Sequence, residues 1–162
     1  MRSRIDVPLD ARDVPGDFAH VHQVDVRLAD TDAMGHVNNA FYLTYVEIGR
    51  IAYYEEVVGR PMALGAHGAD EGMILADIRV TFRTQAYYGE TLAIETRVER
   101  IGGSSFTMVH RLTAPASRYG EARLVAVAES VLVAFDYRAD KPIQVPPEWR
   151  AAIAAFEGWP PA

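Results

Sequence analysis

The sequence predicts an α+β fold in which a curved antiparallel sheet of five strands wraps around one long central helix, in the order β-α-β-β-β-β. Three observations predict this fold. Residues 39–58 have the length and apolar content of a buried helix, four strand-like stretches follow without a second long helix, and the linkers between those stretches are rich in turn residues. Strands joined by hairpins run antiparallel, and a sheet that covers one apolar helix curls around it.

A first strand is predicted over residues 20–29, because apolar and polar side chains alternate there. The polar loop DTDAMGHVNN (30–39) follows and leads into the helix. Asn38 or Asn39 is expected to cap the start of the helix, and Gly59 to end it. Apolar residues occupy nearly every face of the helix, which indicates that other structure surrounds it.

The remaining elements follow from the same periodicities. Four strands are predicted over residues 73–85, 91–101, 105–114 and 122–137, and a short helix with prolines at its entry over 146–156.

The chain length of 162 residues favours one domain. We expect an extended arm over residues 1–19, a domain over 20–137 and a C-terminal extension with the short helix over 138–162.

Composition excludes several functions. The absence of cysteine excludes disulfides, thiolate zinc sites and cysteine nucleophiles. Sixteen basic and 22 acidic residues give a net charge of −6, which argues against binding to nucleic acid. No stretch of 18 apolar residues occurs and the N-terminus lacks the apolar core of a secretory signal, so we expect a cytoplasmic protein that does not insert into membranes.

The loop before the helix carries the most suggestive chemistry. A carboxylate and a histidine beside an apolar helix are costly unless they are hydrogen-bonded or used. The sequence D-x-D-x-x-G-H-V-N-N, followed by F-Y-L-x-Y-x-E-x-x-R, resembles the hotdog-fold acyl-CoA thioesterases, specifically the hydroxybenzoyl-CoA thioesterase-like family. The resemblance covers about residues 20 to 137. Its matching residues are Asp30, Asp32, Gly35, His36, Val37, Asn38, Asn39, Phe41, Tyr42, Leu43, Tyr45, Glu47 and Arg50.

This resemblance implies a hotdog domain with thioesterase activity. Asp32 matches the catalytic carboxylate, which acts either as nucleophile or as general base. The backbone N–H of Asn39, with Ala40 beside it, matches the donors that polarise the thioester carbonyl at the helix start. Glu47 is the reserve candidate, because another branch of the family uses a glutamate on the central helix.

Three polar residues of the loop also have structural interpretations. Asp32 also has a purely structural interpretation, as the acceptor of a turn hydrogen bond. His36 either locks the loop by a hydrogen bond or orients Asp32 or the attacking water, and Asp30 is expected to form a turn.

Substrate contacts are expected from the helix start and from the turn GGSSF (102–106). Some relatives carry basic residues before the Ser-Phe of the turn between the strands at 91–101 and 105–114, where they bind coenzyme A phosphates, and this chain has a glycine pair there instead. The predicted substrate-binding residues are Asn38, Tyr42, Arg83, Arg100, Ser104 and Ser105. Coenzyme A is expected as the carrier and as part of the substrate, with an acyl-carrier protein as the alternative and no separate cofactor. No metal is expected, because His20 and His22 have no recognisable third ligand.

The resemblance further implies a homodimer or tetramer with its sites at the subunit interface. Two other functions remain open on the sequence. A hotdog enoyl-thioester hydratase or dehydratase shares the fold, but its D-x-N-P-x-H motif is absent here. A non-catalytic acyl-thioester-binding protein or interaction module would not need Asp32.

Overall fold

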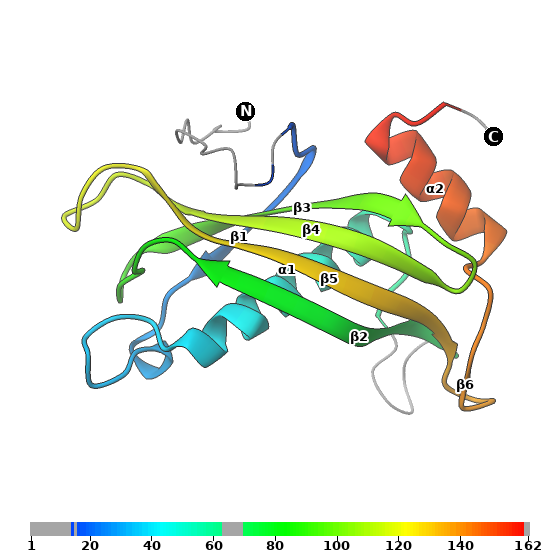
Figure 1. Cartoon of the computed structure of the whole chain (residues 1–162), viewed down its shortest axis with the longest axis horizontal. Helices are drawn as coiled ribbons and strands as arrows, with labels where there is room; N and C mark the ends of the chain where they lie inside the picture. The colour runs from blue at the N-terminus through cyan, green and yellow to red at the C-terminus, as the bar shows by residue number, and fades with distance from the viewer. Residues whose placement is uncertain (1–13, 15, 63–69, 161–162) are drawn as a thin grey trace.

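The computed structural model describes residues 14, 16–62 and 70–160, so most of the predicted arm and the middle of the glycine-rich loop after the helix lie outside the described residues. The predicted order of elements is confirmed, with one short strand added near the C-terminus (Figure 1). The elements are β1 (His20–Asp25), the 3₁₀ turn η1 (Leu28–Asp30), α1 (Asn39–Val57), β2 (Glu71–Phe82), β3 (Thr91–Ile101), β4 (Ser105–Ala114), β5 (Arg123–Asp136), β6 (Lys141–Pro142) and α2 (Pro147–Glu157).

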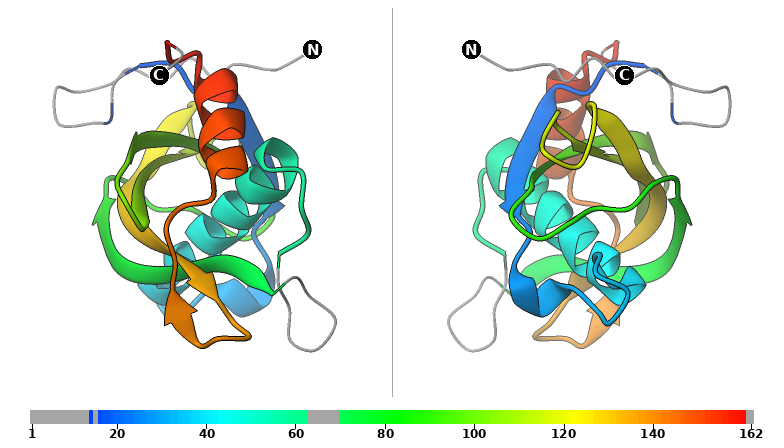
Figure 2. Two further views of the ribbon diagram at one scale, coloured as in Figure 1. Left: turned by 90° about the vertical axis from the view of Figure 1, so that its right-hand side faces the viewer. Right: turned by 90° about the vertical axis from the view of Figure 1, so that its left-hand side faces the viewer.

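The strands form one antiparallel sheet in the order β1-β3-β4-β5-β2, with β6 paired to β5. The sheet lies across α1, and the end-on views in Figure 2 show it curving around the helix. The extra strand has a simple origin. β4 begins opposite Val133, so the last residues of β5 have an open edge on that side, and β6 pairs there with Phe135 and Asp136.

Helix α1 begins and ends as its sequence predicts. The side chain of Asn38 caps its first turn, and Gly59 follows its end with a φ of 73°, a left-handed conformation that favours glycine. The expectation that the helix is covered on nearly every face is wrong, because the sheet covers only one side and Leu43 remains 45% exposed. The buried helix residues are Tyr42, Tyr45, Val46, Gly49, Arg50, Tyr53 and Tyr54.

Two apolar clusters fill the space between α1 and the sheet. One lies under the first half of α1 and includes Val37, Tyr42 and Val125, while the other joins the second half of α1 to Trp149 and Ile153 of α2. The first cluster supports the loop that enters the helix. None of the helices in the described ranges is long and apolar enough to cross a membrane.

Candidate active site

Asp30 anchors the loop that leads into α1. Its side chain is fully buried and accepts hydrogen bonds from the Arg27 guanidinium at 2.7 Å and from the Tyr45 hydroxyl at 2.8 Å. Its carbonyl accepts the N–H of Asn38 at 2.9 Å. Burial raises the pKa of Asp30, but the hydrogen bonds from Arg27 and Tyr45 outweigh burial, so its pKa lies below the ordinary value. Asp30 is therefore a charged anchor of the loop and more than a turn former.

Asp32 lies at the outer side of the same loop and is half-buried. Its Oδ1 accepts the N–H of Met34 at 2.8 Å, which is the turn hydrogen bond that its structural interpretation predicts. The backbone closes the turn as well, because the Asp32 N–H donates to the His36 carbonyl and the Gly35 N–H to the Asp32 carbonyl. Oδ2 of Asp32 has no hydrogen-bond partner within the described ranges.

The start of α1 presents one available backbone donor. The N–H of Ala40 donates to the Asn38 side chain at 2.9 Å, and the N–H of Phe41 donates to the Asn38 carbonyl at 2.9 Å. The N–H of Asn39, the first helical residue, has no acceptor in a preceding turn. It also has no partner elsewhere among the residues that the structure describes. Asn39 is thus the available donor, whereas the N–H of Ala40 is occupied by the cap.

A pocket of about 170 Å³ lies between the start of α1 and the end of β2. It brings together four residues that the sequence predicts for the site, His36, Asn39, Tyr42 and Arg83. Its complete lining is His36, Val37, Asn39, Tyr42, Phe82, Arg83, Thr84 and Gln85. Sequence reasoning missed Val37, Phe82, Thr84 and Gln85, and no local pattern marks them, because the pocket joins segments distant in the sequence.

Two other predicted catalytic residues do not line this pocket in the single chain. Asp32 is absent from its lining, and so is Glu47. Glu47 is exposed and accepts a hydrogen bond from Arg50 at 2.8 Å. Arg50 itself is largely buried, and that burial lowers its pKa. Nδ1 of His36 lies 3.3 Å from the Val37 carbonyl, which is compatible with a loop-locking hydrogen bond.

The predicted phosphate-binding residues lie at the other end of the sheet. Strand β3 has 11 residues, so it carries the chain roughly 30 Å from the pocket end to the β3–β4 turn. There Ser104 accepts a hydrogen bond from Gln144 at 3.1 Å, and Arg100 donates to Thr107 at 3.4 Å. One chain therefore does not bring Arg100, Ser104 or Ser105 to the helix start.

His20, one of the two histidines near the N-terminus, lies beside an aromatic ring and a carboxylate. His20 is buried against the ring of Tyr53, with Nε2 3.5 Å from the carboxylate of Glu56. Within the described ranges, no three His, Asp or Glu side chains lie close enough together to hold a metal ion.

Comparison with known proteins adds to this geometry. The family model of the thioesterase-like superfamily matches residues 26–153, which include the loop, α1, strands β2 to β6 and most of α2, but not β1. The chain belongs to the thioesterase-like superfamily. Its sheet wrapped around one helix is the hotdog fold, as the resemblance implies.

Individual members of this superfamily are similar over most of the chain. YneP of Bacillus subtilis, whose name proposes an acyl-CoA thioesterase, is 29% identical over 133 residues, which are 80% of this chain and 91% of YneP. A thioesterase from Thermus thermophilus, crystallised with coenzyme A and Zn, is 30% identical, with a TM-score of 0.70 over 89% of this chain and 98% of that one. A thioesterase superfamily protein from Jannaschia sp. CCS1 is 21% identical, with a TM-score of 0.76 over 91% and 89% of the two chains, and shares the fold.

Proposed function

We propose that this thioesterase-like protein hydrolyses an acyl thioester of coenzyme A to the free acid and the thiol. The observation that carries the proposal is Asn39, which lines a pocket at a helix start and whose N–H lacks a partner among the described residues. Such a group is a preorganised donor for the oxygen of a thioester carbonyl, and the positive end of the helix dipole adds to it. Coenzyme A as carrier is supported by the related Thermus thermophilus thioesterase that was crystallised with it.

In this mechanism the thioester oxygen accepts the Asn39 N–H, and the rings of Tyr42 and Phe82 provide apolar walls. Asp32 then acts in one of two ways. It either attacks the carbonyl carbon and expels the coenzyme A thiolate, leaving an acyl anhydride that water hydrolyses, or it removes a proton from a water that attacks the same carbon and displaces the thiolate. Because Oδ1 of Asp32 is bound to Met34, Oδ2 is the oxygen assigned to this role. Substrate binding has to bring the carbonyl carbon to that oxygen, since Asp32 lies outside the pocket of the free single chain.

We further propose a homodimer that forms through β2. β2 is an edge strand of 12 residues, and edge strands present unpaired backbone groups that pair readily with another chain. A two-fold axis there would make the two β2 strands antiparallel, so that the Phe82 end of one copy lies beside the Glu71 end of the other. Glu71 pairs with Asp136 at the end of the sheet where the β3–β4 turn lies. The dimer would thereby bring Arg100, Ser104 and Ser105 of one copy toward the pocket of the other.

The test of the activity is thiol release from a panel of acyl-CoA esters by the wild-type chain and by Asp32→Asn. Asparagine keeps the acceptor for the Met34 N–H and removes only the charge, so the turn is preserved. We expect kcat to fall roughly 10³-fold, equivalent to about 4 kcal/mol. Glu47→Gln, which breaks an exposed ion pair, is the matched control and is expected to keep kcat.

Full activity of Asp32→Asn would exclude Asp32 from the mechanism. Inactivity of Glu47→Gln would instead assign the catalytic carboxylate to Glu47 on α1. A wild-type chain that binds acyl-CoA without releasing thiol would refute hydrolysis and favour a binding protein. Hydration of an enoyl-CoA, detected as a hydroxyacyl product with the thioester intact, would instead identify a hydratase.

A mixed dimer tests the shared site. Asp32→Asn and Arg100→Ala chains are each expected to be weakly active alone. In a heterodimer one site holds both substitutions and the other holds neither, so mixing the two chains should restore activity. Mixing without restoration would place Asp32 and Arg100 in the same chain's site or outside it.

A further inference from the structure

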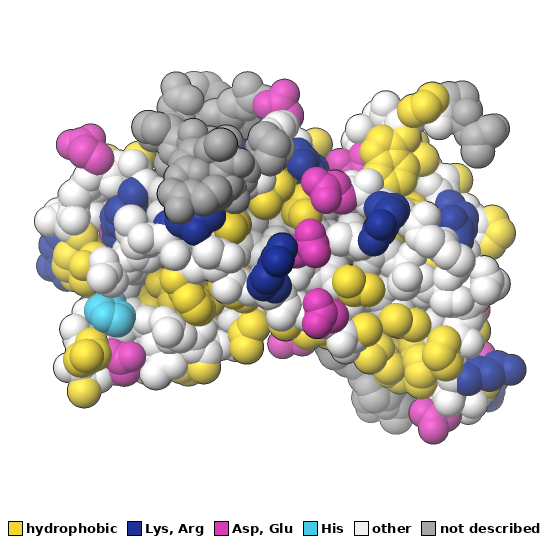
Figure 3. Space-filling view, in the orientation of Figure 1, with side chains coloured by type: hydrophobic (Ala, Val, Ile, Leu, Met, Phe, Trp, Pro, Cys, Tyr) yellow, Lys and Arg dark blue, Asp and Glu magenta, His cyan; other side chains and the backbone are white. Residues whose placement is uncertain are grey.

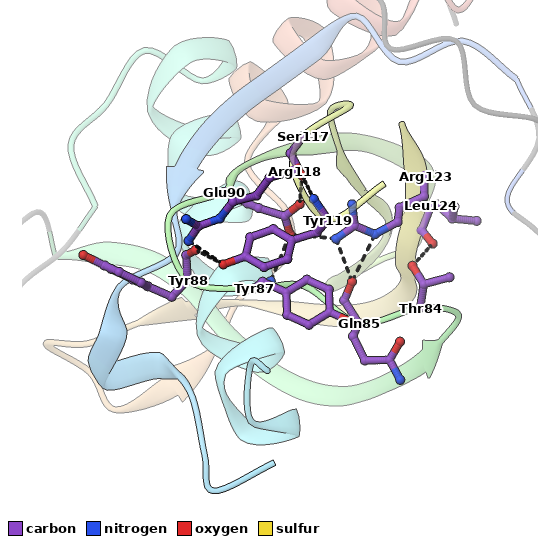
Figure 4. Close-up of polar contacts among 10 residues, drawn as sticks. All are labelled: Thr84, Gln85, Tyr87, Tyr88, Glu90, Ser117, Arg118, Tyr119, Arg123 and Leu124. Carbon is purple, nitrogen blue, oxygen red and sulfur yellow. Dashed lines mark hydrogen bonds and ion pairs between the residues drawn. The ribbon is translucent and has the colours of Figure 1, made fainter. Parts of the chain in front are cut away.

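The pocket wall that faces the helix start is a short stretch of backbone beyond the end of β2. Arg83, Thr84 and Gln85 line the pocket from this stretch. The N–H groups of Arg83 and Thr84 donate to the Val125 carbonyl at 2.8 and 3.2 Å, and the Thr84 hydroxyl donates to the Leu124 carbonyl at 2.8 Å (Figure 4). These bonds tie the first half of the wall to β5. Gln85 is held by a side chain instead.

Arg123 holds Gln85 from the first position of β5. Its Nε and Nη2 donate to the Gln85 carbonyl at 3.2 and 3.0 Å, and the same Nη2 donates to Oε2 of Glu90 at 2.7 Å. Figure 4 shows the guanidinium lying between the Gln85 carbonyl and the Glu90 carboxylate. One planar group thus connects the pocket-lining backbone to a carboxylate.

The Glu90 carboxylate is buried and is held by several hydrogen bonds. Its side chain is only 1% exposed, and besides Arg123 it accepts the Ser117 hydroxyl at 2.7 Å and the Tyr87 N–H at 2.9 Å. Burial raises the pKa of Glu90, but the hydrogen bonds from Arg123, Ser117 and Tyr87 outweigh burial, and its pKa lies below the ordinary value. A buried carboxylate with three donors keeps one orientation, because losing any donor leaves an uncompensated charge.

The same group of residues reaches the opposite wall of the pocket. The Ala86 carbonyl accepts the N–H of Val37 at 2.8 Å, and Val37 lines the pocket just before the helix start. The Glu90 carbonyl accepts the N–H of Val26 at 2.8 Å, at the end of the first strand. Both walls are therefore connected to the segment that Arg123 and Glu90 hold in place.

We infer that Arg123 and Glu90 are positioning residues of the thioester site, which fix Gln85 and Ala86 and thereby set the distance between the pocket wall and the Asn39 amide. This inference rests on the proposed hydrolase function. Neither side chain lines the pocket, so they act through the backbone between them and not by contact with substrate. Displacements of about 1 Å in such a wall reduce catalysis up to roughly 10²-fold.

The test compares two Arg–Glu ion pairs of the sheet, one beside the pocket and one away from it. Removing Arg123 alone leaves a buried charge, so the variant used is Glu90→Gln/Arg123→Met. The control is Glu95→Gln/Arg111→Met, which removes a pair in which Arg111 donates two hydrogen bonds to the Glu95 carboxylate, at 2.6 and 2.9 Å. Glu95 lies between Ile94 and Thr96, whose side chains face Gly49 of α1, so this pair lies on the opposite face of the sheet. Acidic and basic side chains are interspersed over the sheet in Figure 3.

Kinetics are measured well below the melting temperature of each variant. We expect kcat of Glu90→Gln/Arg123→Met to fall 10-fold or more with KM changed less than 3-fold, while the control keeps both parameters within 2-fold. A purely structural role would lower the melting temperature and leave kcat of the folded protein unchanged, which would overturn the inference. Equal losses of kcat in both double variants would overturn it as well.

Amide hydrogen exchange gives a second readout that does not depend on activity. We expect the N–H groups of Val37 and Thr84 to exchange at least 10-fold faster in Glu90→Gln/Arg123→Met and at the wild-type rate in the control. Unchanged exchange at both amides would refute the positioning role of Arg123 and Glu90. If the wild-type chain hydrolyses no acyl-CoA, the proposed function fails. The exchange rates then still show whether Arg123 and Glu90 hold the pocket wall in place.

Discussion

The side chain of Asn38 accepts the N–H of Ala40 at 2.9 Å, and this single contact decides which amide of the helix start is available. With the N–H of Phe41 bound to the Asn38 carbonyl, the N–H of Asn39 has no partner among the described residues, and Asn39 lines the pocket. A cap that satisfies the second and third amides while leaving the first is suited to anion binding.

Asn39→Pro is expected to remove this donor and leave the helix intact. Proline is favoured at the first helical position, and Asn38 already has φ −65° and ψ 138°, the conformation that a residue before proline prefers. Loss of one oxyanion donor should lower kcat roughly 10²- to 10³-fold. Asn39→Ala keeps the N–H and should keep kcat. Thiol release by the two variants checks this, and equal rates would exclude the Asn39 amide from the mechanism.

Gly49→Ala is expected to destabilise the protein, although alanine favours helices by about 1 kcal/mol over glycine. A Cβ at Gly49 would lie 2.5 Å from Cγ2 of Ile94 and 3.2 Å from Oγ1 of Thr96, where α1 crosses β3. Overpacking of this kind costs about 1–3 kcal/mol. Urea unfolding measures the change, with Thr44→Ala on the exposed face of α1 as the control. A Gly49→Ala protein that is more stable than wild type would contradict the close approach.

His110 is expected to make stability depend on pH. It is fully buried between Oγ of Ser130 at 3.0 Å and Oγ1 of Thr96 at 3.1 Å. Burial first, and then the charges of Arg50 and His20, lower its pKa to about 3. The unfolded chain, with a pKa near 6.5, therefore takes up the proton first. The contribution of neutral His110 to the free energy of unfolding is fully present above about pH 6.5. It is lost as the pH falls toward 3, by about 1.4 kcal/mol per pH unit.

Urea unfolding of the wild type and of His110→Gln at pH 7 and pH 5 measures this dependence. An amide keeps a donor and an acceptor but does not titrate in this range. Over these two pH values we expect the wild type to lose about 2 kcal/mol more than the variant. Equal losses of unfolding free energy in the two proteins between pH 7 and pH 5 would mean that His110 does not cause the pH dependence.

Glu157 is expected to fasten α2 to the rest of the fold. Its Oε1 accepts the Tyr53 hydroxyl at 2.5 Å and the Val98 N–H at 2.9 Å, at the point where β3 has an irregular register. Glu157→Ala should cost about 2–3 kcal/mol, because hydrogen bonds to a charged acceptor are strong. Tyr53→Phe should cost less, and the double variant should show coupling between the two residues. Additive losses in urea unfolding would mean that the contact contributes little.

The sequence by itself determined the order of elements, because a helix of 19 residues and strands with alternating side chains have different periodicities that can be read locally. It also determined the ends of α1, since Asn38 and Gly59 act on the backbone next to them. The family resemblance carried the choice of His36, Asn39 and Tyr42, and Arg83 was predicted as a substitute for basic residues that this chain lacks; the pocket brings the four together.

Tertiary structure alone decided the relationships between distant segments. Arg123 and Glu90 are 33 residues apart, and nothing in either neighbourhood indicates that they meet or that they hold Gln85. Asp30 and Asp32 are the same residue type two positions apart, yet one is a buried anchor and the other is half-exposed. Burial and pairing depend on how the sheet curves around α1 and on where β5 passes the end of β2, and long-range packing sets both.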